Sequence, residues 1–265
     1  YIDAINQKLP NLTSLAKFVS NRHFGVGSDG MVLICESKVA DFKMRMFNPD
    51  GTEAEMCGNA LRSVGKYAYE HRLTDKPIFF IETLGGIKKI ELEVDKDKVI
   101  NIKADIGSPI FDPKLIPVNT KKDRFILEEV TILDQTFKMS SLSWGNPHTV
   151  IFVEDVNHFD VEKYGSAIEN NLELFPNKTN VTFAQILDYN TIRIREWERG
   201  TGETLGCATG CSSAVVFSHM LGLTSNKCIV EQIGGTIEIE YKDNTLFMKG
   251  PSHTVFESEI DISLL

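Results

Sequence analysis

The segment Phe42-Lys-Met-Arg-Met-Phe47 has a near copy in Ile192-Arg-Ile-Arg-Glu-Trp197, which lies 150 positions further along the chain (192 − 42). Both segments alternate apolar and polar residues, as half-buried β-strands do. The same offset matches Cys57 with Cys207, Glu53 with Glu203, Ser63 with Ser213, Leu73 with Leu223 and Thr74 with Thr224. With one gap, Gly85-Gly86 meets Gly234-Gly235. The repeat predicts a duplicated half-molecule in which each copy presents one thiol.

Composition narrows the class of protein. The chain has 265 residues, 42% of them hydrophobic and 25% charged, which is typical of soluble globular domains. Lys and Arg number 28 against 37 Asp and Glu, a net charge of −9 without a basic cluster, so nucleic acid and acidic membranes are not expected partners. The five cysteines form no C-x-x-C pair, which favours reduced thiols and a cytoplasmic protein.

Periodicity predicts the secondary structure. Helices are expected at 12–21, 58–69, 161–170 and 208–221. Strands are expected at 31–35, 42–47, 78–83, 87–94, 99–105, 149–153, 181–187, 191–197, 227–231, 236–241, 245–249 and 253–257. The expected fold is α/β (α+β), with two pseudo-symmetric domains that each wrap a curved mixed or antiparallel sheet around a central helix, and with the active site in the cleft between them.

The domain boundary is expected in the glycine- and proline-rich stretch 105–117. The N-terminal half is predicted to span 1–110 and to be completed by 252–265, and the C-terminal half to span 111–251. The chain opens at Tyr1 inside an apolar run, and the second copy has a preceding segment, 144–148, without a counterpart in the first. We therefore expect that a short N-terminal segment precedes Tyr1 in the intact protein.

Cys57 and Cys207 both follow an acidic, turn-rich loop and open a predicted helix. A helix N-terminus carries free N–H groups and a partial positive charge, which should lower the thiol pKa and bind a carboxylate. Two such thiols could flank an α-carbon, one removing a proton and the other returning one, with the sulfurs roughly 7 Å apart around the substrate. The simpler interpretation, a buried structural thiol, is expected for Cys35, Cys211 and Cys228.

Four motifs together closely resemble diaminopimelate epimerase. They are Asn48-Pro-Asp-Gly-Thr-Glu-Ala-Glu-Met-Cys-Gly-Asn59, Gly145-Asn-Pro-His148, Glu198-Arg-Gly-Thr-Gly-Glu203 and Cys207-Ala-Thr-Gly210. The resemblance implies an isomerase that needs no pyridoxal phosphate, other cofactor or metal. It would interconvert LL- and meso-diaminopimelate through a thiolate and a thiol, in lysine and peptidoglycan precursor synthesis.

The resemblance also assigns residues. It implies that Cys57 and Cys207 are the two bases and that His148 and Glu198 tune them. The positions whose amides would hold the α-carboxylate are Gly58, Asn59, Ala208 and Thr209. Those that would grip the distal amino-carboxylate end are Asn48, Asn146, Asn180 and Arg199. The sequence departs from the family at Ala60 and Ala208, where glycine is usual, and it lacks the opening His-Gly-x-Gly-Asn-Asp segment.

Three other interpretations compete. Gly25-Val-Gly-Ser-Asp-Gly30 fits a dinucleotide-binding pattern, but the predicted helix precedes it and the strand follows it, which is the reverse of the required order. Another cofactor-independent amino-acid racemase of the same fold is the main alternative. A redox protein using Cys207 and Cys211 is disfavoured, because their spacing is not C-x-x-C. The expected partner is a small-molecule substrate, and the assembly is left open, with a homodimer as one option.

Overall fold

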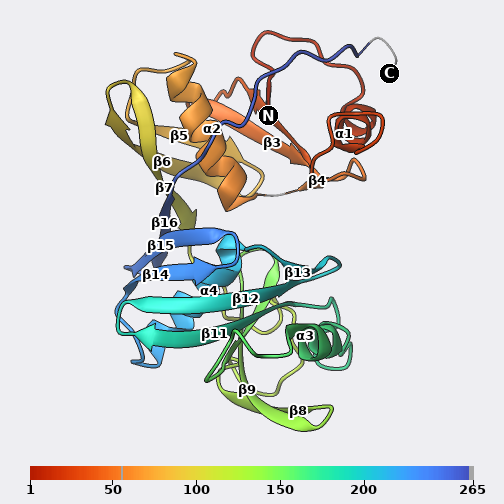
Figure 1. Cartoon of the computed structure of the whole chain (residues 1–265), viewed down its shortest axis with the longest axis vertical. Helices are drawn as coiled ribbons and strands as arrows, with labels where there is room; N and C mark the ends of the chain where they lie inside the picture. The colour runs from red at the N-terminus through yellow and green to blue at the C-terminus, as the bar shows by residue number, and fades with distance from the viewer. Residues whose placement is uncertain (55, 263–265) are drawn as a thin grey trace. The chain divides into compact units, whose positions relative to one another are not determined.

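The computed structural model describes residues 1–54 and 56–262. The chain divides into two compact units, a first unit of Tyr1–Asp105 with Gly250–Leu265 and a second unit of Ile106–Lys249 (Figure 1). The predicted completing segment 252–265 includes 263–265, which lie outside the described residues. Among the helices of the described residues, none is both long and apolar enough to cross a membrane.

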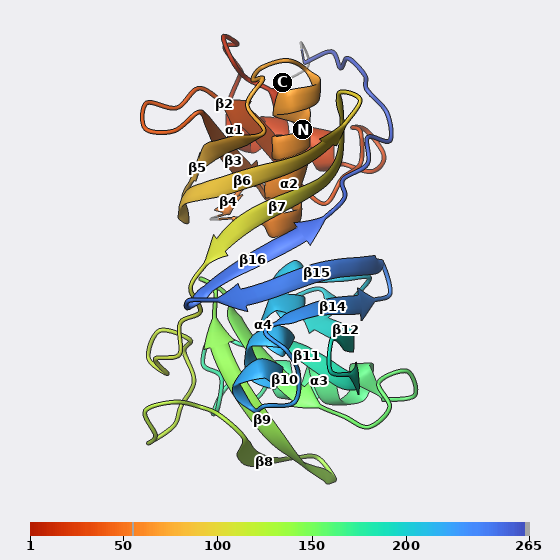
Figure 2. The ribbon, with the colours of Figure 1, turned by 90° about the vertical axis from the view of Figure 1, so that its left-hand side faces the viewer.

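The first unit is a mixed sheet with two helices. The sheet order is β1-β2-β3-β5-β6-β7, and β4 pairs with β3. Its elements are β1 Ile2–Asp3, α1 Leu12–Ser20, β2 Met31–Cys35, β3 Phe42–Phe47, β4 Glu53–Ala54, α2 Gly58–Glu70, β5 Ile78–Thr83, β6 Gly86–Asp95 and β7 Lys98–Gly107. Helix α2 packs closely on the sheet because Gly65 leaves room for Ile90 of β6 and Ile102 of β7 (Figure 2).

The second unit repeats this plan with more strands. The sheet order is β16-β15-β14-β12-β11-β10-β9-β8, and β13 pairs with β12. Its elements are β8 Glu128–Ile132, β9 Gln135–Ser143, β10 Pro147–Phe152, α3 Val161–Glu169, β11 Asn180–Asp188, β12 Thr191–Glu198, β13 Gly202–Thr204, α4 Ala208–Met220, β14 Lys227–Gln232, β15 Gly235–Lys242 and β16 Thr245–Gly250.

Helix α4 is the central helix of the second unit. Every residue from Gly210 to Ser218 is buried, so the helix has no solvent-facing stripe in this stretch. It packs against β10, β11, β12, β14 and β15, which surround it. A helix that is apolar on all sides has to lie inside the protein, and the curved sheet provides that environment.

The internal repeat extends to strand register. Phe42 pairs with Ile81 in the first unit, and Ile192 pairs with Val230 in the second. Likewise Met46 lies opposite Ala54, and Glu196 lies opposite Thr204. The offset of 150 found in the sequence, which becomes 149 after the one gap (230 − 81), therefore aligns structurally equivalent residues.

The predicted fold class is confirmed, and so are all four predicted helices to within a residue or two. The prediction of a strand at 253–257 is wrong, because these residues belong to no strand and are exposed. The apolar residues Val255 and Phe256 are neighbours in the sequence, so the segment lacks the alternation of apolar and polar residues that marks a half-buried strand. The hairpin of β8 and β9 went unpredicted. In β9, Ser140, Ser141 and Ser143 are buried although they are polar, so hydrophobicity does not reveal that this segment is buried on both faces.

Candidate active site

The two cysteines occupy the same structural position in their respective units. Cys57 is the N-cap residue of α2 with φ −137° and ψ 123°, and Cys207 is the N-cap residue of α4 with φ −125° and ψ 115°. Both residues are half-buried, and each sulfur is held at a helix start.

In the first unit, a buried arginine organises the start of α2. Arg62 Nη2 donates to Asn59 Oδ1 over 2.8 Å, and Nη1 donates to the carbonyl of Gly58 over 3.4 Å. Asn48 lies at the start of the turn between β3 and β4, where its Nδ2 donates to Thr52 Oγ1 over 3.0 Å. Cys57, Gly58 and Asn59 are thus adjacent at one helix terminus, whereas the Asn48 side chain stabilises its own turn.

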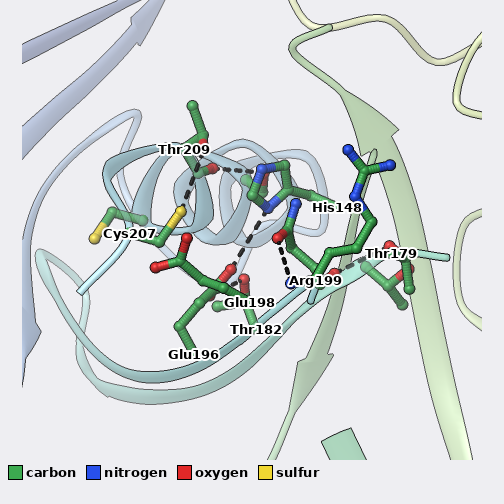
Figure 3. A network of polar contacts seen from close by, with 12 residues as sticks. His148, Thr179, Thr182, Glu196, Glu198, Arg199, Cys207 and Thr209 are labelled. Atoms are coloured by element: carbon green, nitrogen blue, oxygen red, sulfur yellow. Dashed lines mark hydrogen bonds and ion pairs between the residues drawn. The ribbon is translucent and has the colours of Figure 1, made fainter. Parts of the chain in front are cut away.

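In the second unit, polar side chains from several elements gather at the start of α4 (Figure 3). His148 comes from β10, Glu198 from the end of β12, and Cys207 and Thr209 from the helix start. Thr204 of β13 donates to Glu198 Oε1 over 2.6 Å, and Thr209 Oγ1 lies 3.3 Å from the sulfur of Cys207. The structure therefore brings together His148, Glu198, Cys207 and Thr209, four of the residues of this unit for which proton handling or carboxylate binding was predicted.

The pKa of Cys207 is raised well above the usual value of a thiol, contrary to the sequence-based expectation. Burial is the largest cause, followed by the negative charges of Glu196 and Glu198. The hydrogen bonds from Thr209 and from the backbone N–H of Gly210 act in the opposite direction but are outweighed. A helix N-terminus alone does not make this thiol acidic, because burial and, to a smaller extent, two carboxylates oppose it.

The carboxyl group of Glu198 also has a raised pKa. Burial is the main cause and the charge of Glu196 adds to it, while Thr204 and His148 favour the charged form. A carboxyl group that holds its proton to higher pH is suited to proton transfer near neutrality.

Two residues predicted to grip the substrate are instead engaged with the backbone. Asn180 is buried, its Nδ2 donates to the carbonyl of Pro147 over 2.8 Å, and its Oδ1 accepts from the N–H of Arg199 over 2.9 Å. Arg199 is exposed, and its Nη1 donates to the carbonyl of Asn177 over 3.0 Å. Asn180 thereby fixes the start of β10 relative to the end of β12, next to His148 and Glu198.

The loop that carries Asn146 is tied to the central helix. Trp144 Nε1 donates to Ser213 Oγ of α4 over 3.0 Å. Ser213 in turn donates to the carbonyl of Thr209 over 2.7 Å. The half-buried Asn146 therefore precedes His148 on a loop that is anchored to the same helix as Cys207.

Sequence reasoning missed Glu196 and its partner Thr182. Glu196 is 1% exposed, and its Oε2 accepts a hydrogen bond of 2.5 Å from Thr182 Oγ1. A signal was present, because Ile192, Ile194 and Glu196 follow one another at every second position on the inward face of β12. A carboxylate on a face that otherwise buries isoleucine indicates a specific environment.

The other three cysteines differ in how deeply they are buried. Cys211 and Cys228 are buried, as predicted, and Cys211 donates to Gln232 Oε1 over 3.2 Å, whereas Cys35 is only half-buried.

The glycine-rich stretch 25–30 lies between α1 and β2 and thus follows a helix and precedes a strand. The arrangement needed for a dinucleotide-binding turn is reversed there.

Comparison with solved structures identifies the class of fold. A probable proline racemase from Agrobacterium radiobacter K84 matches with a TM-score of 0.71 at 13% identity, covering 95% of this chain and 81% of that one. At this level of identity the match shows a shared fold. The chain therefore shares the fold of that protein, here built from two similar sheet-and-helix units.

Sequence comparison identifies the family. The family model described as diaminopimelate epimerase matches residues 1–111 and 140–255. The diaminopimelate epimerase of Methanococcus maripaludis strain C5 is 50% identical over 99% of this chain and 95% of its own length. That of Acetivibrio thermocellus is 46% identical over 100% of this chain and 95% of its own length. The chain belongs to the diaminopimelate epimerase family and is an isomerase.

Proposed function

We propose that this chain interconverts LL- and meso-diaminopimelate by moving one proton at one α-carbon, with Cys57 and Cys207 as the two acid/base groups. Family membership supports the substrate. The observation that carries the mechanism is the equivalence of the two cysteines, each the N-cap residue of its unit's central helix with an extended backbone. That both sulfurs face one substrate is part of the proposal.

In the proposed reaction, one sulfur is a thiolate and removes the α-proton, which leaves a carbanion stabilised as an enolate-like form of the carboxylate. The other sulfur is a thiol and delivers its proton to the opposite face of the same carbon. The configuration inverts, and the two sulfurs have exchanged protonation states. Backbone N–H groups at the helix starts, from Gly58 and Asn59 and from Ala208 and Thr209, would hold the α-carboxylate and the charge that develops on it.

Cys207 and its neighbours fit the thiol partner of this pair in the free protein. Burial and two nearby carboxylates hold the pKa of Cys207 well above its usual value, so its proton is retained at neutral pH. We assign the initial role of proton donor to Cys207 and that of proton acceptor to Cys57.

One observation favours a second candidate, another amino-acid racemase of the same fold. The side chain of Asn180 is bound to Pro147 and Arg199, and the guanidinium of Arg199 to Asn177, so part of the expected distal grip is engaged within the chain. A substrate panel that includes diaminopimelate and monocarboxylic amino acids, proline among them, separates the two candidates.

The decisive experiment incubates the full-length protein with LL-diaminopimelate in D₂O. Formation of the meso form with deuterium at only one α-carbon, read by NMR and mass spectrometry, is the expected result. At low conversion, before the LL form is re-formed and bound by its other end, deuterium at both α-carbons would rule out the proposed function, as would turnover of proline but not diaminopimelate.

The setting of this function is also a proposal. The substrate class places the enzyme in lysine and peptidoglycan precursor synthesis, which is cytoplasmic, and a homodimer is the assembly we would test first. Sedimentation velocity of the purified protein across a concentration series distinguishes a monomer of 29.7 kDa from a dimer.

A further inference from the structure

Glu196 and His148 form a buried pair beneath the start of α4. Glu196 Oε1 lies 3.6 Å from His148 Nδ1, and the two side chains are 1% and 0% exposed. Within the described part of the chain, neither His148 nitrogen nor Glu196 Oε1 has a hydrogen-bond partner. Buried polar atoms without partners are rare and costly, and they concentrate where function requires them.

Two contacts hold the Glu196 carboxylate in place. Thr182 of β11 donates to its Oε2 over 2.5 Å. Gly210 of α4 lies directly over the same carboxylate, and a Cβ atom at position 210 would collide with all three of its terminal atoms. The strand and the helix thus leave this carboxylate one free oxygen, which faces His148 (Figure 3).

The charged and titratable groups around Glu196 come from three elements. His148 is on β10, Glu198 follows on the same face of β12, and Cys207 caps α4. Glu196 contributes to the electrostatics of both Glu198 and Cys207, and in both cases it disfavours a further negative charge. Thr182, the only other side chain bonded to Glu196 among the described residues, is neutral.

We propose that Glu196 is a positioning residue for the reaction, whose carboxylate orients the imidazole of His148 and places a negative charge beside the start of α4, where Cys207 lies. This inference rests on the proposed function for its catalytic consequence. The repeat supports it, because the equivalent position in the first unit is Met46, opposite Ala54 as Glu196 is opposite Thr204. A carboxylate is therefore not needed at this position to build the fold, and it makes the environment of Cys207 different from that of Cys57.

The test is the pH dependence of alkylation of Cys207 in the free protein, followed by iodoacetamide labelling and peptide mass spectrometry. Glu196→Gln removes the charge and keeps the shape, and Glu196→Met copies the residue of the first unit. Removing a negative charge near a thiol lowers its pKa, so in both variants the labelling profile should move to lower pH. A shift of about one pH unit corresponds to about tenfold faster labelling at neutral pH.

Turnover provides the second readout. Both variants should show kcat reduced by at least about tenfold, with a pH profile displaced in the same direction as the labelling and with KM little changed. The matched control is Glu231→Gln, which neutralises a carboxylate of the same unit that is bound to Arg193, and it should leave labelling and turnover as in the unaltered protein.

An unchanged Cys207 labelling profile in both variants would overturn the inference. If Glu196→Gln fails to fold, Glu196→Met decides the matter, since methionine already occupies the equivalent position, Met46, in the first unit. Labelling requires no substrate. A protein that does not epimerise diaminopimelate would therefore refute the proposed function while leaving the result for Glu196 interpretable.

Discussion

Arg195 binds Glu203 through two parallel hydrogen bonds, with Nε to Oε1 at 2.6 Å and Nη2 to Oε2 at 2.9 Å. The pair joins β12 to β13 just before the loop that leads to Cys207. In the first unit, Arg45 and Glu53 form the same pair at 2.8 and 2.9 Å, just before the loop that leads to Cys57. A bidentate arginine–carboxylate pair requires a specific geometry. Its recurrence indicates that the same interaction orients the loop before each cysteine.

The two arginines should differ in their contribution to stability. Arg195 Nη1 also donates to the carbonyls of Val156 and Phe159, at 3.1 and 2.8 Å, and Arg195→Ala leaves these acceptors without that donor. We expect Arg195→Ala to lower the free energy of unfolding by about 2–3 kcal/mol. Arg45 donates its side-chain hydrogen bonds to the carboxylate of Glu53, and Arg45→Ala should cost about 1 kcal/mol. Urea denaturation of both variants measures this, and equal losses would show that the extra carbonyl contacts contribute nothing.

Replacing either cysteine by serine should abolish most of the interconversion. A hydroxyl at the same position is far less acidic than a thiol and is a poor proton donor and acceptor at neutral pH. We expect kcat to fall by at least about a thousandfold in Cys57→Ser and in Cys207→Ser. The control is Cys228→Ser, a buried cysteine of β14, which should change stability but leave kcat close to that of the unaltered protein. Retention of substantial activity in either of the first two variants would contradict a mechanism with two thiols.

Glu198→Gln should lower turnover and raise the melting temperature at high pH. The pKa of the Glu198 carboxyl is raised above its ordinary value of 4.5, mainly by burial, so the folded protein binds this proton more tightly than the unfolded chain does. Its stabilising contribution is therefore present below pH 4.5 and is lost as the pH rises through the raised pKa. Glutamine carries no charge and can still accept from Thr204. The melting temperature of the variant should exceed that of the unaltered protein at pH 8 and not at pH 4, with turnover reduced at both. A constant difference across pH would argue against the raised pKa.

Gly210→Ala should destabilise the second unit, although alanine normally favours a helix by up to about 1 kcal/mol over glycine. The new methyl group would collide with the Glu196 carboxylate, which Thr182 holds in place. Overpacking of this kind costs about 1–3 kcal/mol. Shortening Glu196 to alanine in the same chain should recover most of the loss, which a double-mutant cycle by thermal denaturation can measure. Additive effects of the two changes would show that no such contact exists.

The sequence predicted most of the architecture because the repeat and the strand periodicity are local signals. The segment 42–47 became β3 and 192–197 lies within β12, as expected. The predictions failed where burial does not follow hydrophobicity. In β9, serines are buried, and in 253–257, Val255 and Phe256 face solvent. Such positions depend on tertiary neighbours that no single segment reveals.

The same limit applied to the candidate site. Motifs pointed to His148, Glu198 and Cys207, and the structure brings these three residues together in the second unit. Local reasoning from the helix start nevertheless gave the wrong direction for the pKa of Cys207. It could not weigh burial, or the charges of Glu196 and Glu198 from a different element, against the helix N-terminus. Electrostatic environments are sums over the fold, so motif spacing identifies the participants more readily than their protonation.

Position 210 has a consequence for sequence variation in this architecture. Because the helix backbone passes directly above the side chain at 196, the sizes of these two residues are linked. Lineages that keep a long acidic side chain on the strand should retain glycine on the helix, and a larger residue there should accompany a shorter one beneath it. Substitutions at 196 and 210 should therefore occur together. Relatives with a shorter, uncharged residue at 196 and a larger one at 210 would lack the carboxylate that lies beside the start of α4.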